Sequence, residues 1–362
     1  MNGTRAHGVI AGLWNTLSAM SNPDVLVIGA GFAGAMIAAN LAEQGAQVSV
    51  IDALHVAAGA TRRTLGLATP SLTPAHVKET AQGVQRLTQI AAQHGVLPQA
   101  CRVLHVASAA PRADALRLNG LSLTDAQFKW ETSPSLVPSG FGGGLSVDGS
   151  AVLDIGMLTT KLLQHRGITV HTGIEVSQLE YHEGRMMALA AGYTIRANSV
   201  VLATNAYCGL LSPYLSDAVQ FARGMVWTSR MIEASEPNDD DADDVADIQM
   251  PLIVDNGRLT VVPGADDRVR IAAWQWDELL TSDPTEAIQQ FLGTYLPHLA
   301  QHTELWQNSV TTLTRDGAPL VGKLDGEGSV FYAVGLGLYG LAWGASVAAR
   351  VAELMTGTHA GL

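Results

Sequence analysis

The sequence predicts a mixed α/β protein in which a domain with a parallel sheet is interleaved with a second domain built on a mixed or antiparallel sheet. Three observations lead to this class. A strand, a glycine-rich turn and a helix follow one another near residue 24, and the same succession recurs near residue 330. Between them lie stretches of alternating polar and apolar residues, which are typical of half-covered strands. The 362 residues, 47% of them hydrophobic, suffice for two domains.

The first of these successions contains every part of a Rossmann-like dinucleotide-binding unit. Val25–Ile28 predicts a buried parallel strand, the run GAGFAG (29–34) supplies G-x-G-x-x-G, and Phe32–Glu43 has helical spacing. A second strand over 47–51 ends at Asp52, near the spacing of an acid that binds ribose hydroxyls. The three glycines allow the tight turn, the approach of a pyrophosphate and close helix packing. FAD and NAD both bind this way, and a nucleotide-free unit is the alternative.

The second succession precedes the last predicted helix. Val330–Val334 predicts a strand, three glycines over 335–340 repeat the G-x-G-x-x-G spacing, and a helix is expected over 341–355. A second helix N-terminus is therefore available to a distant group of the same extended cofactor. For a flavin that group is the pyrimidine edge, where a positive helix end stabilises the reduced ring by ~1–2 kcal/mol. The alternative is that these glycines serve only helix–sheet packing.

Together these segments resemble the D-amino-acid-oxidase-like FAD family, which includes glycine oxidase, monomeric sarcosine oxidase and glutamylputrescine oxidoreductase. Members end in a T-x-D-G-x-P-x-x-G turn, a strand and a glycine-rich loop, matched here by TRDGAPLVG (314–322) and GLGLYGL (335–341). GATRRTLG (59–66) is similar to the segment that passes the flavin, LDI (153–155) to a V-D-P motif, and TNAY (204–207) to the strand end near the ADP half. The resemblance implies an FAD-binding domain of glutathione-reductase/D-amino-acid-oxidase type.

The resemblance also implies which residues bind FAD. The bond is expected to be noncovalent, because no Cys stands near 307–312 and no His in the TRRT segment, where relatives attach the flavin. The expected FAD-binding residues lie in the two glycine-rich turns, the segment after the second strand, the adenine-side loop and the C-terminal turn. They are Gly29, Ala30, Gly31, Phe32, Ala33, Gly34, Asp52, Ala53, Thr61, Arg62, Arg63, Thr64, Gly66, Leu67, Val176, Ala203, Thr204, Asn205, Arg315, Gly335, Gly337, Leu338, Tyr339, Gly340 and Leu341.

The activity that the resemblance implies is that of an FAD-dependent amine or amino-acid oxidase or dehydrogenase. A hydride passes from the carbon beside the nitrogen to the flavin, and the imine is then hydrolysed. The expected partners are a small-molecule amine or amino acid and either dioxygen or another electron acceptor. The cofactor carries the redox step, and the protein supplies orientation and electrostatics.

Residues that bind an amino-acid carboxylate are harder to name. Such a site needs an Arg, whose planar fork matches a carboxylate. The family position for it, three residues before Thr314, is Thr311, which disfavours an α-amino acid. Arg223, Arg258 and Arg270 in the predicted second sheet are candidates to replace it, although a surface role is open for each.

We therefore expect four residues on the substrate side. Tyr339 occupies a position that His often holds in the family. Arg270 loosely matches the position of an oxygen-activating Lys in sarcosine oxidases, and Arg223 is the second arginine candidate. Trp274 is expected to form an aromatic wall suited to an amine, with core packing as the alternative.

The expected domains interleave along the chain. The FAD-binding domain takes 20–94, 149–210 and 311–362, the substrate domain takes 95–148 and 211–310, and 1–19 form an N-terminal arm. Substrate-domain strands are expected over 224–232, 252–255, 258–262 and 268–274, with a hairpin turn at Asn256-Gly257. The acidic run 233–247 predicts a solvated loop, with attraction of a cationic amine as the alternative.

Composition excludes several other classes of protein. A formal net charge of −12 argues against nucleic-acid binding. Only Cys101 and Cys208 are present, so reduced thiols in the cytoplasm are expected, and no Cys/His spacing suggests a metal. The charge-free stretch 330–349 is long enough for a membrane span, but its glycines and strand-like start predict strand, turn and buried helix instead.

Three alternatives remain at this point. An NAD-dependent dehydrogenase explains the first motif but not the second. A flavoenzyme acting on a modified tRNA is disfavoured by the acidic composition. A flavin-bound subunit of a larger complex would contain the same motifs, and the oligomeric state is open.

Overall fold

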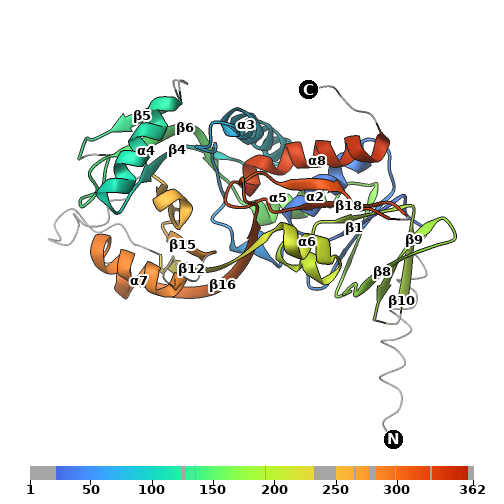
Figure 1. Ribbon diagram of the computed structural model, residues 1–362. Coiled ribbons are helices and arrows are strands. Elements are labelled where there is room, and N and C mark those ends of the chain that lie inside the picture. The colour runs from blue at the N-terminus through green and yellow to red at the C-terminus, as the bar shows by residue number, and fades with distance from the viewer. Residues whose placement is uncertain are drawn as a thin grey trace, which may run out of the picture.

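The computed structural model describes residues 22–123, 127–134, 136–191, 193–231, 250–264, 266–276, 283–297, 299–326 and 328–357. The predictions for the arm 1–19 and for the acidic run 233–247 lie outside these residues. The described strands form sheets of six, three and nine strands. In Figure 1 the six-stranded sheet lies on the right beneath helix α8, and the nine-stranded sheet lies on the left with α4 and α7.

The six-stranded sheet has the order β17-β18-β11-β1-β2-β7. Neighbouring strands are parallel, except that β17 is antiparallel to β18. Both faces of the sheet are covered, which explains why its strands are almost continuously apolar. The strands are β1 (Val25–Ile28), β2 (Val48–Asp52), β7 (Ile168–Thr172), β11 (Ser199–Leu202), β17 (Leu320–Lys323) and β18 (Val330–Val334).

Helices cover one face of this sheet and a small sheet covers the other. Val27, Val50 and Val201 share one core with four helices, which are α2 (Phe32–Glu43), α3 (Val77–Gln93), α5 (Ile155–Leu162) and α8 (Gly340–Thr356). Leu26 and Leu202 point the other way, into a core shared with the three-stranded sheet and α6 (Pro213–Ala218). The three-stranded sheet consists of β8 (Gln178–His182), β9 (Arg185–Ala190) and β10 (Tyr193–Ala197).

The nine-stranded sheet is mainly antiparallel, with one parallel pair between β13 and β4. Its order is β16-β12-β15-β14-β13-β4-β6-β3, and β5 pairs with β6. The strands are β3 (Leu67–Ala68), β4 (Gln99–Val106), β5 (Phe128–Glu131), β6 (Gly144–Val152), β12 (Gln220–Ser229), β13 (Leu252–Val254), β14 (Leu259–Pro263), β15 (Val269–Gln275) and β16 (Thr303–Leu313).

Two helices pack on opposite faces of this second sheet. Helix α7 (Pro284–Tyr295) covers one face through a core around Trp227. It begins where Asp283 accepts hydrogen bonds from the amides of Thr285 and Glu286, and its first residue is Pro284. Helix α4 (Ala110–Ser122) covers the β4–β6 end of the other face. The rest of that face is left for a site.

The structure confirms the mixed α/β class and the two glycine-rich units. Helix α2 spans the predicted residues, and the stretch 330–349 contains strand β18, a turn and most of α8. Among the described residues no helix is long and apolar enough to cross a membrane. The expected hairpin forms between β13 and β14, with Asn256 at a φ of 58°. The strand expected over 224–232 begins earlier, at Gln220, because it pairs along β16 from Leu313.

The predicted domain boundaries remain a prediction. Strand β6 crosses the proposed boundary at 149, and β16 crosses the one at 311. Strand β3, inside the first predicted domain, pairs with β6 in the nine-stranded sheet.

Candidate functional site

Three strands of the six-stranded sheet end side by side where both glycine-rich turns begin. Strands β18, β11 and β1 are neighbours and run parallel, so their carboxyl ends lie along one edge. The turn after Ile28 leads into α2, the turn after Val334 leads into α8, and the chain after Leu202 lies between them. Two motifs that are far apart in the sequence therefore lie close together in space.

The glycines of the first turn have different functions. A Cβ on Gly34 would lie 1.9 Å from the backbone oxygen of Gly29, so α2 approaches β1 this closely only because the side chain is missing. A Cβ on Gly31 would meet only the Thr61 hydroxyl oxygen, at 3.2 Å. Packing within the chain thus requires glycine at position 34, whereas the space beside Gly31 is open to a ligand.

Polar groups that suit an anion gather at this edge. The Phe32 amide donates to Oγ1 of Thr61 at 2.9 Å, and the next amides of α2 have no partner within the helix. The N-terminus of α8 begins at Gly340, directly after the second turn. Thr204, which lies between the two turns, has a buried hydroxyl without a hydrogen-bond partner. Two positive helix ends and an unpaired hydroxyl suit a ligand with phosphates and hydrogen-bonding groups.

Asp52 lies at the end of β2, the next strand of the same edge. Its Oδ2 accepts from the Ala30 amide and its Oδ1 from the Leu54 amide, both at 2.8 Å. The Ile174 amide donates to the Asp52 carbonyl at 3.1 Å, which brings the loop that carries Val176 to this strand end. The residues expected near the ribose and the adenine therefore come together beside the first glycine turn.

Asn205 connects this edge with the last strand of the nine-stranded sheet. Its φ of 49° is left-handed, a conformation that Asn adopts more readily than most residues. Its Nδ2 donates to the Val310 carbonyl at 3.2 Å, and its Oδ1 accepts from the amide and hydroxyl of Thr312 at 3.3 and 3.1 Å. The Gly335 amide donates to the same Thr312 hydroxyl at 3.1 Å. One amide side chain and one hydroxyl thus hold β11, β16 and the second glycine turn together.

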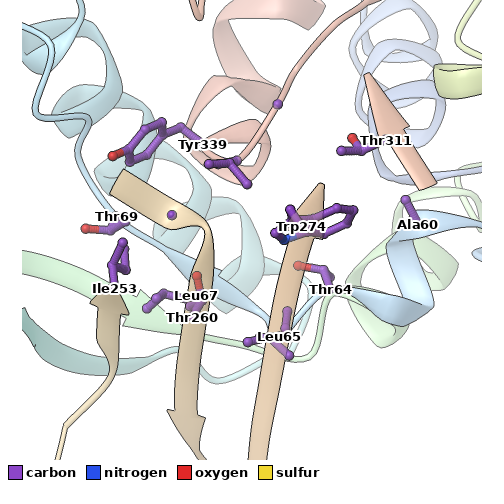
Figure 2. A pocket seen from close by; sticks show the side chains of 14 residues that line it. Ala60, Thr64, Leu65, Leu67, Thr69, Ile253, Thr260, Trp274, Thr311 and Tyr339 are labelled. Atoms are coloured by element: carbon purple, nitrogen blue, oxygen red, sulfur yellow. The ribbon is translucent and has the colours of Figure 1, made fainter. Parts of the chain in front are cut away.

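A cavity that opens to solvent lies where these segments meet the nine-stranded sheet, and Figure 2 shows it from close by. Its lining comes from the segment after β2, from the face of β13 to β15, from β16 and from the turn before α8. The lining residues are Ala60, Thr64, Leu65, Leu67, Thr69, Ile253, Gly257, Thr260, Ala272, Trp274, Thr311, Gly337, Leu338 and Tyr339.

The face of three adjacent strands forms one wall of this cavity. Ile253, Thr260 and Ala272 are paired across β13, β14 and β15, so their side chains share one face. Trp274 lies on the same face, and a Cβ on Gly224 of the next strand would come within 2.5 Å of its ring. In Figure 2 the indole projects from the end of β15, with Thr64 beneath it in this view.

Tyr339 contributes the second aromatic side chain of the cavity. It is the N-cap residue of α8, and its ring projects from the C-terminal turn in Figure 2. Burial raises the pKa of its phenol to about 12, although a backbone hydrogen bond from Leu72 acts in the opposite direction. The hydroxyl is therefore protonated at neutral pH and can donate a hydrogen bond.

The arginines predicted on the substrate side do not line the cavity. Arg223 lies on the opposite face of β12, where its Nη2 donates to Oε1 of Gln275 at 2.9 Å. Arg270 is on the cavity face, but its Nη1 donates to Oδ1 of Asp266 at 2.9 Å, away from the lining residues. Arg258 directly follows a lining glycine and is partly exposed.

Several of the other predicted residues can be placed relative to the cavity. Six of the expected cofactor or substrate residues line the cavity, namely Thr64, Leu67, Trp274, Gly337, Leu338 and Tyr339. Three of the expected cofactor residues are exposed, namely Ala53, Arg62 and Arg315. Arg63 donates to the Ala58 carbonyl at 3.2 Å within its own segment.

The comparison with protein families decides the identity of this arrangement. The family model for FAD dependent oxidoreductases, DAO, matches residues 24–354. The chain belongs to this family. FAD is therefore the cofactor of this FAD-dependent oxidoreductase, and the NAD-dependent alternative is wrong. No curated protein matches the sequence.

Solved structures show the same fold. Glycine oxidase from Geobacillus kaustophilus is 18% identical, with a TM-score of 0.76 over 94% of this chain and 96% of that one. L-proline dehydrogenase from P. horikoshii is 17% identical, with a TM-score of 0.77 over 93% and 94%. Iminodiacetate oxidase from Chelativorans sp. BNC1 is 21% identical, with a TM-score of 0.71 over 93% and 96%. At these identities the likeness concerns the fold.

Three features of the carboxyl edge of this flavoenzyme fit FAD. Space is open beside Gly31, the Thr204 hydroxyl is unpaired, and two helices begin at the edge. Sequence reasoning missed several lining residues, among them Leu65, Thr69, Ile253, Thr260 and Ala272. Alternation in the predicted strands groups the last three on one face, but it does not show which face a second domain leaves open.

Proposed function

We propose that this FAD-dependent oxidoreductase oxidises a carbon–nitrogen bond of a small amine or amino acid. One observation carries the proposal. The second glycine turn, whose strand ends beside that of the first, opens directly into the cavity, because Gly337, Leu338 and Tyr339 line it. A single extended cofactor held at the first turn would therefore reach the wall formed by the nine-stranded sheet.

The proposal assigns the two ends of FAD to different elements. The pyrophosphate would lie at the N-terminus of α2 beside Gly31, with Asp52 on the ribose and Val176 on the adenine side. The N-terminus of α8 would face the pyrimidine edge of the ring. When bound noncovalently, FAD supplies a two-electron acceptor that takes a hydride from the carbon beside the amine nitrogen and leaves an imine for water to hydrolyse.

Residues of the chain would bind and orient the amine. Trp274 and Tyr339 offer aromatic surface, and the Tyr339 hydroxyl, which accepts a hydrogen bond from the Leu72 backbone, keeps its own proton to donate. The paired face of β13 to β15 excludes water from one side. Such positioning is the protein's main contribution when the cofactor carries the chemistry.

Stopped-flow spectroscopy of the purified enzyme tests this function. A yellow protein that releases FAD on denaturation, and whose flavin is bleached anaerobically by members of an amine and amino-acid panel, is the expected result. Mixing the reduced enzyme with air then distinguishes dioxygen from another acceptor. The proposal fails if FAD is bound but no amine or amino acid reduces it. Either dioxygen or another molecule is proposed as the electron acceptor. A cytoplasmic location is proposed as well, because Cys101 and Cys208 are free thiols.

A further inference from the structure

We infer that the substrate is an amine with apolar substituents and without a carboxylate, an inference that rests on the proposed amine oxidation. The described lining of the cavity is composed of apolar, glycine, threonine and aromatic residues. Four threonine hydroxyls, the Tyr339 phenol and the Trp274 indole N–H are its polar side-chain groups, so hydrogen bonding there is between neutral groups. A neutral amine nitrogen matches such partners, whereas a carboxylate needs a cation or several converging donors.

A neutral histidine continues the row of paired side chains that forms the cavity wall. His105 on β4 pairs with Ile253 and continues the row that runs through Thr260 and Ala272. His105 is 2% exposed, and its Nε2 is buried without a hydrogen-bond partner. Burial lowers its pKa to about 3, so the imidazole is neutral at physiological pH. The one ring in this row that could carry a positive charge is therefore no partner for an acid.

Aromatic surface faces the apolar part of such a substrate. The Trp274 ring lies against the backbone of Gly224, where a Cβ would come within 2.5 Å of the ring atoms. Leu67, Leu338 and Ile253 add branched aliphatic surface to the lining. Flat aromatic and branched aliphatic surface of this kind gains free energy from apolar substituents, and the indole face also attracts an approaching ammonium group.

The cationic side chains of the second sheet are directed to other partners. Thr311 stands where the family resemblance would place the carboxylate-binding Arg, and it is only 9% exposed, with its hydroxyl directed to Asn205 Oδ1 at 3.5 Å. Arg270 is paired with Asp266, and Arg223 contacts Gln275 on the opposite face. A carboxylate buried among these neutral groups would lower binding by about 100-fold or more relative to the same molecule without it.

The charge of the whole chain acts in the same direction. Its formal net charge of −12 repels anions over distances within about a Debye length and attracts ammonium ions. Long-range attraction and local chemistry therefore favour the same class of molecule.

Matched triplets of substrates test the inference on the holoenzyme. We would measure anaerobic flavin reduction by pyrrolidine, prolinamide and proline, and by phenethylamine, phenylalaninamide and phenylalanine. Within a reactive triplet, the rate constant for reduction divided by Kd should be about 100-fold lower for the acid than for the amine. The amide, which has nearly the size of the acid but no negative charge, should stay within about tenfold of the amine.

Three variants separate charge from shape. Thr260→Arg places a guanidinium at a partly exposed lining position and should raise the acid-to-amine ratio by about tenfold, whereas Thr260→Gln, of similar reach, should not. Arg258→Gln should leave the ratio of the wild-type enzyme unchanged. Retained flavin content shows that each variant is folded.

Each outcome decides between the possibilities. An acid that reacts as well as its amine overturns the inference but leaves the proposed function standing. An amide as poor as its acid shows that size excludes the acid, which also overturns the inference. Selective loss of acid oxidation in Arg258→Gln would identify a carboxylate site that contradicts it. Failure of every compound in both triplets and in the wider panel removes the proposed function itself.

Discussion

The carboxyl edge of the six-stranded sheet and the cavity face of the nine-stranded sheet would serve one reaction, but they are built from different chemical groups. The edge is a main-chain surface of glycine turns and helix N-termini. The face consists of side chains from β13, β14 and β15, joined by residues from both ends of the chain. Cofactor binding should therefore depend on a few backbone positions. Substitutions on the cavity face should change substrate choice without loss of the cofactor.

The largest expected effect separates two glycines of the first turn. Gly34→Ala places a Cβ 1.9 Å from the Gly29 carbonyl and should destabilise even the apoprotein by more than about 4 kcal/mol. Gly31→Ala meets only the Thr61 hydroxyl at 3.2 Å, so the apoprotein should melt near the wild-type temperature but retain little FAD. Thermal melts of both apoproteins and flavin absorbance check this. Equal melting temperatures for the two variants would contradict the distinction.

The next effect concerns the cavity face alone. Gly224→Ala forces the Trp274 ring to move, because the added Cβ would lie within 2.5 Å of it. Flavin content should be unchanged, while amine-dependent flavin reduction should fall by about 10- to 100-fold. Trp274→Phe is the control, since a smaller ring can remain over Gly224. Loss of FAD in Gly224→Ala would show that the edge and the face are not separable.

Asn205 contacts both regions, so its substitution should affect cofactor binding and substrate binding together. Asn205→Gly relieves the left-handed backbone but removes the acceptor of the Thr312 amide and hydroxyl and the donor to Val310. A loss of about 1–3 kcal/mol in unfolding free energy is expected from the unpaired groups. The Kd for FAD and the KM for the amine should both rise, as titration and steady-state assays would show. A change in only one of them would restrict Asn205 to that region.

A smaller effect is expected from Tyr339. Because burial raises the pKa of its phenol to about 12, the hydroxyl should remain protonated across the pH range of ordinary assays. Tyr339→Phe should lower amine-dependent reduction by about tenfold through the lost hydrogen bond. The pH profile of kcat should keep its shape, which rate measurements from pH 6 to pH 9 would test. A profile that loses an ionisation would assign a proton-transfer role to this phenol.

The last effect concerns stability in acid alone. The pKa of His105 falls from 6.5 to about 3 in the folded state through burial, so the unfolded state binds the proton more readily. Its contribution to stability is complete above pH 6.5 and is lost as the pH falls toward 3. His105→Leu should therefore lose less stability than the wild type between pH 6.5 and pH 4 in denaturant titrations. The same change at exposed His182 is the control.

Some of this architecture follows from local patterns. The first βαβ unit and the last strand and helix depend on apolar spacing, glycine positions and short connections, which act within about thirty residues. The predicted bounds of α2 and β18 match the observed ones for this reason. Strands β4, β6 and β16 depend instead on partners far along the chain, and their bounds were not predictable from local pattern.

The substrate side shows the same limit at the level of single residues. Trp274 and Tyr339 were expected in the site and line the cavity, whereas Arg223 and Arg270 were expected there and lie elsewhere. Strand alternation determines which side chains share a face, but ion pairing and sheet pairing determine where the guanidinium group of an arginine lies. Arg270 forms an ion pair with Asp266, four residues away. Its guanidinium is therefore directed to that carboxylate near the surface, and moving it into a cavity would cost this pair and the hydration of the charge.

The sequence by itself determined the two glycine turns, because each rests on backbone geometry that a short motif encodes, and its match to the family over residues 24–354 determined the family and the cofactor. Only the tertiary structure decided that the second turn opens into a cavity and that the paired face of β13 to β15 forms its wall. The physical reason is that a cavity is made where elements distant in sequence fail to fill space between them. That depends on the pairing and packing of the whole chain rather than on any one segment.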